Sequence, residues 1–183
     1  MKRIFLAINL PPEIRYELEA IVAELKLPVW MRPIDSRDWH VTVLFLGEQN
    51  EGDVEKVKTA IREVFIVIGA PAINLQKITY GPAGGEARMV WAKANGETSQ
   101  DLGVLQNRIS NSLRKHRVNF KIDYPDFNGH ITLAKFEPGK RLSPLDESLN
   151  LIFRAETLDL MESNLTNGGS GYEILEKFKF KVE

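Results

Sequence analysis

The chain has 183 residues, 43% of them hydrophobic and 27% charged, which is typical of a globular protein that can bury a core. Its formal net charge of −1 excludes a molecule-wide cationic field for long nucleic acids, but it allows a local cluster of donors for a small phosphorylated ligand. There is no cysteine, which excludes disulfides, thiolate metal ligands and cysteine nucleophiles. No apolar run suits a signal peptide or a membrane span, so we expect a cytoplasmic protein.

Apolar periodicity predicts alternating strands and helices in the first half of the chain. The run Ile4 to Leu10 is typical of a buried strand, and Pro12 suits the first turn of the helix expected after it. A strand is expected from Trp39 to Leu46, where Val, Leu and Phe are dense and Gly47 follows. The spacing of apolar residues predicts a second helix over 53–65.

In the second half, the pattern predicts a hairpin of strands 73–80 and 87–94 around the loop 81–86, then a helix over 99–115. A strand over 127–136 and a short helix over 145–149 are expected next. Strands over 153–160 and 172–182, around the loop 166–171, complete the prediction. The order strand, helix, strand occurs twice. Antiparallel sheet with helices outside is the simplest packing of this order, so we expect one α+β domain over residues 1–183. If the repetition is structural, the domain has two lobes around a cleft.

Two of the three histidines lie in matching strings, His40-Val41-Thr42-Val43 and His130-Ile131-Thr132-Leu133. Threonine fills 7 of 183 positions, so two such His-x-Thr strings arise by chance at roughly 0.5%. Both strings fall in predicted strands, where side chains alternate between faces. Each strand therefore presents an imidazole and a hydroxyl on one face and apolar side chains on the other.

Two imidazoles that face a common cleft suit phosphodiester cleavage, because one group must accept a proton while the other donates one. Thr42 and Thr132 could donate hydrogen bonds to the non-bridging oxygens of a phosphate. Two other interpretations of the strings remain: cross-strand packing pairs, and a metal site, for which the strings offer few ligands. The third histidine, His116, follows Arg114 and Lys115 at a predicted helix end, where a cationic cluster is expected without any catalytic role.

Further stretches carry a resemblance to a known family: Arg3 to Ile8 followed by Pro11, His40 to Gly47, and Met161 to Leu165 followed by Gly171-Tyr172. With the paired His-x-Thr strings, these stretches resemble the two-histidine phosphoesterase superfamily, and within it the LigT-like RNA 2′,3′-cyclic phosphodiesterases. The resemblance implies a bilobal fold with a pseudo-twofold axis, two antiparallel sheets flanking a central cleft, and neither metal nor cofactor. It also implies a monomer that acts on RNA ends, those of tRNA included, or on cyclic nucleotides.

The resemblance further implies the chemistry. A terminal 2′,3′-cyclic phosphate would be opened to a 2′-phosphate, with His130 activating water and His40 protonating the departing 3′ oxygen. Phe45 would pack against the nucleobase, and Lys135 would meet the phosphate. The catalytic candidates are thus His40, His130, Thr42 and Thr132, and Phe45 and Lys135 are the substrate-binding candidates.

Two departures from the family pattern leave alternatives open. Gly129 stands where proline is common, and Lys135 stands where arginine is usual. In addition, Phe45 and Lys135 each follow a histidine by five residues, so strict alternation places them on the opposite face unless the strands bulge or end. The alternatives are 2′–5′ RNA ligation, which is the reverse reaction, and a nucleotide-binding module without turnover.

Overall fold

The computed structural model describes residues 1–65, 68–82, 85–122, 126–166 and 169–181, so the predicted loops 81–86 and 166–171 lie partly outside it. The elements in chain order are β1 (Lys2–Asn9), α1 (Pro12–Glu24), β2 (Arg32–Pro33), η1 (Ser36–Asp38), β3 (His40–Gln49), α2 (Glu51–Phe65), β4 (Ala72–Gly81), β5 (Met89–Ala94), α3 (Gly96–Lys115), β6 (His130–Lys135), β7 (Asp146–Arg154), β8 (Thr157–Thr166) and β9 (Gly169–Lys179). None of the helices in these ranges is both long enough and apolar enough to cross a membrane.

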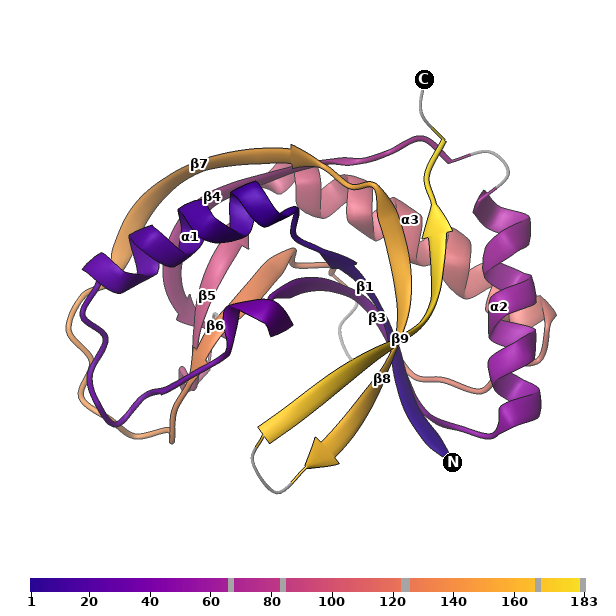
Figure 1. The fold of residues 1–183 in the computed structure, drawn as a ribbon, viewed down its shortest axis with the longest axis horizontal. Helices are drawn as coiled ribbons and strands as arrows, with labels where there is room; N and C mark the ends of the chain where they lie inside the picture. The colour runs from indigo at the N-terminus through magenta and orange to yellow at the C-terminus, as the bar shows by residue number, and fades with distance from the viewer. Residues whose placement is uncertain (66–67, 83–84, 123–125, 167–168, 182–183) are drawn as a thin grey trace.

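One antiparallel sheet runs through the molecule in the order β7-β4-β5-β6-β3-β1-β8-β9, with β2 paired to β6 (Figure 1). The α+β prediction is confirmed. The predicted repetition is present too, because β1-α1-β3 and β5-α3-β6 have the same order and each ends in a strand that begins with a histidine. The two expected sheets form one nine-stranded sheet, whose two halves join where β3 pairs with β6.

The main core lies between the sheet and its helices. On β1, Ile4, Leu6 and Ile8 are fully buried in this core, while Phe5 and Ala7 belong to a separate cluster on the other face. This alternation follows from the two-residue period of a strand. Helices α2 and α3 lie side by side, as Figure 1 shows, and each buries its apolar stripe here.

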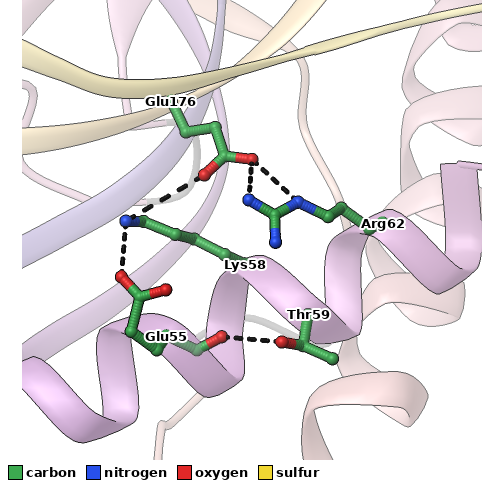
Figure 2. A network of polar contacts seen from close by, with 5 residues as sticks. All are labelled: Glu55, Lys58, Thr59, Arg62 and Glu176. Carbon is green, nitrogen blue, oxygen red and sulfur yellow. Dashed lines mark hydrogen bonds and ion pairs between the residues drawn. The ribbon is translucent and has the colours of Figure 1, made fainter.

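A network of charged side chains fastens α2 to β9 (Figure 2). Glu176 on β9 accepts two hydrogen bonds from Arg62, at 2.7 and 3.0 Å, and lies 4.0 Å from Lys58. Lys58 also pairs with Glu55 at 2.6 Å. Because these groups are partly exposed, each pair stabilises the fold only slightly, and the network mainly orients α2 against the last strand.

Three predictions in the C-terminal part were wrong. The segment expected as a short helix over 145–149 belongs to β7, where Leu149, Leu151 and Phe153 are buried in alternation with exposed residues. That pattern has the period of a strand, not of a helix. The strand expected over 153–160 in fact spans the end of β7 and the start of β8, and β6 is shorter than the expected 127–136.

The junction between the two halves offers a test of the fold. Ile131 is fully buried opposite Val41, so Ile131→Ala should lower the free energy of unfolding by about 2–5 kcal/mol. Ile152→Ala on β7 is the matched control, because Ile152 is 57% exposed and should lose far less. Urea denaturation of the two variants measures the difference, and equal losses would contradict this account of the core.

Candidate active site

The pairing of β3 with β6 brings the two His-x-Thr strings together. Val41 pairs with Ile131 in an antiparallel register, so His40 falls opposite Thr132 and Thr42 falls opposite His130. Val41 and Ile131 point into the core, while the histidines and threonines are half-buried on the other face. The two imidazoles and two hydroxyls therefore share one face of the sheet, on neighbouring strands and not on strands that face each other across a cleft.

Both imidazoles are held in the same way. The Nδ1 of His40 lies 2.7 Å from the carbonyl oxygen of Asp38, and the Nδ1 of His130 lies 2.7 Å from the carbonyl oxygen of Asn128. A carbonyl oxygen can only accept, so each Nδ1 carries a hydrogen and donates it. In the neutral form, each Nε2 is therefore an acceptor that can take up a proton, and each ring has a defined orientation.

The surroundings of both rings favour the neutral form. Burial is the main cause that lowers the pKa of His40 below its usual value, and the charges of His130 and Lys135 lower it further. Burial also lowers the pKa of His130, with a further contribution from Lys93. Because the charge of His130 acts on His40, a proton on one ring disfavours a proton on the other. The pair is suited to holding one proton between two bases.

Matched bulges bring Phe45 and Lys135 to the histidine face. On β3 the register with β1 skips Val43, and Val43 and Leu44 are both buried. The alternation therefore shifts by one residue, so Phe45 shares the face of His40 and Thr42. Its ring lies 5.9 Å from that of Phe5, whose own ring is 5.1 Å from the imidazole of His40, measured between centroids.

The second bulge repeats the first. On β6 the register with β5 skips Leu133, and Leu133 and Ala134 are both buried, which moves Lys135 to the face of His130 and Thr132. The carbonyl oxygens of the two skipped residues are satisfied, since Val43 accepts from Gln106 at 2.8 Å and Leu133 accepts from the amide of Ile34 at 2.8 Å. Strict alternation alone had placed Phe45 and Lys135 on the wrong face.

Sequence reasoning assigned no role to the aromatic side chains that pack on the histidines, although Phe5 and Tyr172 lie in stretches that carry the family resemblance. Tyr172 of β9 meets the ring of His40 edge-on at 5.2 Å, and Phe5 packs against both rings. Trp91 of β5 stacks on His130 with centroids 3.9 Å apart and planes 25° apart. Strand pairing makes these contacts, and the nearest sequence signal was that Phe5 and Trp91 lie in predicted strands that begin the two repeats.

The Trp91 indole packs closely against Gly81 of the neighbouring strand β4. Trp91 is 6% exposed, and Gly81 on β4 leaves room for its indole, because a Cβ added at Gly81 would overlap the ring. The indole Nε1 is buried without a hydrogen-bond partner among the described residues. Packing therefore determines the position of the Trp91 indole, and the indole fits only if residue 81 has no side chain.

A polar pair lies beside His40. Asn9 is opposite His40 in the β1–β3 register, and its side-chain amide donates to the carboxylate of Asp159 at 2.7 Å. Asp159 is almost fully buried, and its second carboxylate oxygen has no partner among the described residues. The amide orientation of Asn9 is thus set by a buried acceptor.

The remaining histidine, His116, does not belong to this face of the sheet. His116 caps the end of α3, and its Nε2 lies 3.0 Å from a carboxylate oxygen of Glu63 on α2. Within the described ranges, no group of three or more His, Cys, Asp or Glu side chains is arranged to hold a metal ion.

Comparison with known proteins finds similar phosphoesterases. The family model for LigT like Phosphoesterase matches residues 8–91, which include the first string. An Archaeoglobus fulgidus relative, named RNA 2′,3′-cyclic phosphodiesterase, is 27% identical over 97% of this chain and 99% of its own length. A Thermus thermophilus relative with the same name is 29% identical over 99% of this chain and 91% of its own length.

Solved structures have the same fold. A crystal structure of a Thermus thermophilus protein superposes with a TM-score of 0.83 at 24% identity, covering 97% of both chains. Escherichia coli LigT complexed with 3′-AMP superposes with a TM-score of 0.79 at 20% identity, covering 99% of this chain and 98% of LigT. These superpositions show that the chain has the fold of LigT. Over residues 8–91 the chain is similar to the LigT like Phosphoesterase family, and over nearly its full length it is similar to relatives named RNA 2′,3′-cyclic phosphodiesterase.

The close contact between Gly81 and the Trp91 indole allows a test of the site geometry. Gly81→Ala should displace the indole from His130, and it should lower stability by about 1–3 kcal/mol because the added methyl overpacks the site. Near-UV circular dichroism and urea denaturation measure the two effects. Gly85→Ala is the control, since a Cβ there meets nothing. An unchanged aromatic spectrum in Gly81→Ala would argue against the stacked arrangement.

Burial of the two imidazoles also predicts a pH dependence of stability. Both pKa values are lower in the folded chain than the usual value of about 6.5, so the unfolded chain binds more protons between those values. Stability should therefore be full above about pH 6.5 and fall as the pH drops through the folded pKa values. A His40→Gln, His130→Gln double variant should lose less stability between about pH 7.5 and about pH 5.5 than the wild type. Equal slopes in urea denaturation would contradict the prediction, because contributions from carboxylates are common to both chains.

Proposed function

We propose that this protein hydrolyses a terminal RNA 2′,3′-cyclic phosphate to a 2′-phosphomonoester, with His40 and His130 as general acid and base and without a metal ion. The observation that carries the proposal is the pairing of Val41 with Ile131, which leaves two half-buried imidazoles on one face of the sheet, each with its Nδ1 hydrogen donated to a backbone carbonyl. Each Nε2 is then the atom that exchanges a proton with substrate or water.

In this mechanism the Nε2 of neutral His130 takes a proton from water as the water oxygen bonds to phosphorus. The bond from phosphorus to the 3′ oxygen breaks, and protonated His40 gives its proton to that oxygen. The electrostatics support a single shared proton, because the charge on His130 lowers the pKa of His40. After one turnover the proton has moved from His40 to His130, so the pair must return it before the next turnover.

The developing negative charge on phosphate is met by three groups on the same face. Thr42 and Thr132 lie opposite the histidines and can donate to the non-bridging oxygens. Lys135 is near enough to His40 for its charge to lower the pKa of that imidazole, and it can bind a phosphate as a point charge. Lysine cannot form the planar two-bond contact of arginine, which separates this site from the usual family pattern.

An aromatic surface is available for the nucleobase. Phe45 is 58% exposed on the histidine face, and it packs against Phe5 at its base. Base stacking on such a ring contributes about 1–3 kcal/mol. The names of the Archaeoglobus and Thermus relatives support the RNA substrate, and the LigT complex with 3′-AMP supports a nucleotide in this fold.

The experiment that tests the proposal is turnover, in EDTA, of an RNA that ends in a 2′,3′-cyclic phosphate. Loss of one acid or base group should lower kcat by about 10²–10⁴-fold in His40→Ala and in His130→Ala. His116→Ala is the matched control, because His116 pairs with Glu63 away from the sheet face. Chromatography against 2′- and 3′-phosphate standards should identify the 2′-phosphate as product.

Three other outcomes would each contradict one part of the proposed function. Activity only with added metal would contradict the acid–base mechanism, and a 3′-phosphate product would contradict the leaving group. No turnover, together with tight binding of the RNA end, would indicate a nucleotide-binding module instead.

A further inference from the structure

A cavity of about 250 Å³ lies beside the segment that precedes His130, and the proposed chemistry does not use it. Residues from β4, β5, the start of α3 and the segment before β6 line it, among them Lys77, Lys93, Ser99 and Asn128. The carbonyl oxygen of Asn128 is also the acceptor that holds the Nδ1 of His130. Asn128 therefore contacts both the cavity and the Nδ1 side of the imidazole, and Lys93, which lines the cavity, pairs with His130 in the β5–β6 register.

Two lysines face each other across the strands beside this cavity. Lys77 on β4 pairs in register with Lys93 on β5, and like charges directly opposite each other destabilise a sheet. Asp146 neutralises Lys77 at 3.0 Å. Within the part of the chain that the structure describes, Lys93 belongs to no ion pair. An anion in the cavity would offset the repulsion that remains.

The charge of Lys93 also makes His130, one of the two proposed catalytic histidines, a weaker base. Lys93 lies opposite His130 in the β5–β6 register, where opposite Cβ atoms are about 4.5–5.5 Å apart. Its charge lowers the pKa of His130, which makes the imidazole a weaker base. The sheet does not require a cation here, whereas a bound anion would benefit from one.

Ser99 adds a hydroxyl donor to the same wall. The backbone amide of Gly129 donates to the Ser99 oxygen at 3.2 Å, so that oxygen already acts as an acceptor. Its own hydrogen can then point toward a ligand in the cavity. Proline, which is common in the family at position 129, has no amide hydrogen and could not make this bond. The glycine thus fixes a donor beside the lysine.

We propose that this cavity binds a second phosphate group of the substrate, carried on the 5′ side of the terminal nucleoside, through Lys93 and Ser99. The proposal rests on the proposed function, because the cyclic phosphate must lie between the histidines for its neighbour to reach the cavity. The second phosphate is either the internucleotide phosphate of an RNA chain or the 5′-phosphate of a mononucleotide. In both cases the site selects substrates with two phosphates over a nucleoside cyclic phosphate with a free 5′-hydroxyl.

The test compares kcat/KM for three substrates: a nucleoside 2′,3′-cyclic phosphate with a 5′-hydroxyl, the same nucleotide with a 5′-phosphate, and a trinucleotide ending in the cyclic phosphate. Loss of one charged contact should lower the preference for the second phosphate about tenfold in Lys93→Gln. Lys115→Gln removes an exposed lysine from the end of α3, so its preference should equal that of the wild type. Assays are made on the pH plateau of each variant, because removal of the Lys93 charge also raises the pKa of His130.

The substrate arms separate the sources of the phosphate. A preference confined to the trinucleotide assigns the site to the internucleotide phosphate, and one shared by the 5′-phosphorylated mononucleotide assigns it to any 5′-phosphate. An equal loss on all three substrates in Lys93→Gln would overturn the proposal, because the lysine would then act only through His130. No loss of preference would overturn it too.

A binding measurement separates this proposal from the proposed function. Calorimetry should find that a nucleoside 2′,5′-bisphosphate binds more tightly than the 2′-monophosphate, and that Lys93→Gln removes the difference. If the wild type turns over no substrate but this difference is present, the hydrolase proposal fails while the subsite stands. If the two ligands bind equally to the wild type, the subsite is contradicted whatever the turnover.

Discussion

One antiparallel bridge, between Val41 and Ile131, determines the arrangement of the whole histidine face. It joins the two halves of the nine-stranded sheet, and both residues are fully buried. Because side chains alternate along a strand, a slip of one residue at this bridge would bury a histidine and expose an apolar side chain. The hydrophobic cost of that slip makes the register, and with it the meeting of His40 with Thr132, a consequence of core packing.

The two bulges extend that face beyond the histidines. Each occurs at the residue after a threonine, and each satisfies its freed carbonyl oxygen with a donor from a distant segment. A regular strand would have turned Phe45 and Lys135 toward the core, where a lysine cannot be buried cheaply. The bulges therefore place an aromatic and a cationic side chain at matched positions on either side of the bridge.

The halves are equivalent at the histidines and different in the strands beside them. In the first half, Ala7 and Asn9 lie opposite the threonine and the histidine, and in the second half Trp91 and Lys93 take those positions. One imidazole is thus stacked on an indole beside a cation, and the other lies beside an amide. The two histidines are equivalent in position but have different neighbours, so one can favour the neutral form and the other the protonated form. Acid–base catalysis needs one histidine in each form.

Most of the strands, the three long helices, the α+β class and the paired strings could be predicted from the sequence, because periods of 2 and 3.6 residues are local properties. The sequence did not predict the full extent of β7, whose alternation at Leu149, Leu151 and Phe153 was interpreted in part as a helix. Only the tertiary structure decided that Trp91 stacks on His130, since that contact depends on pairing between β5 and β6 and on room left by a glycine of β4. The bulges were decided there as well, because buried packing across strands overrides strict alternation, and no local pattern specifies which residue the partner strand skips.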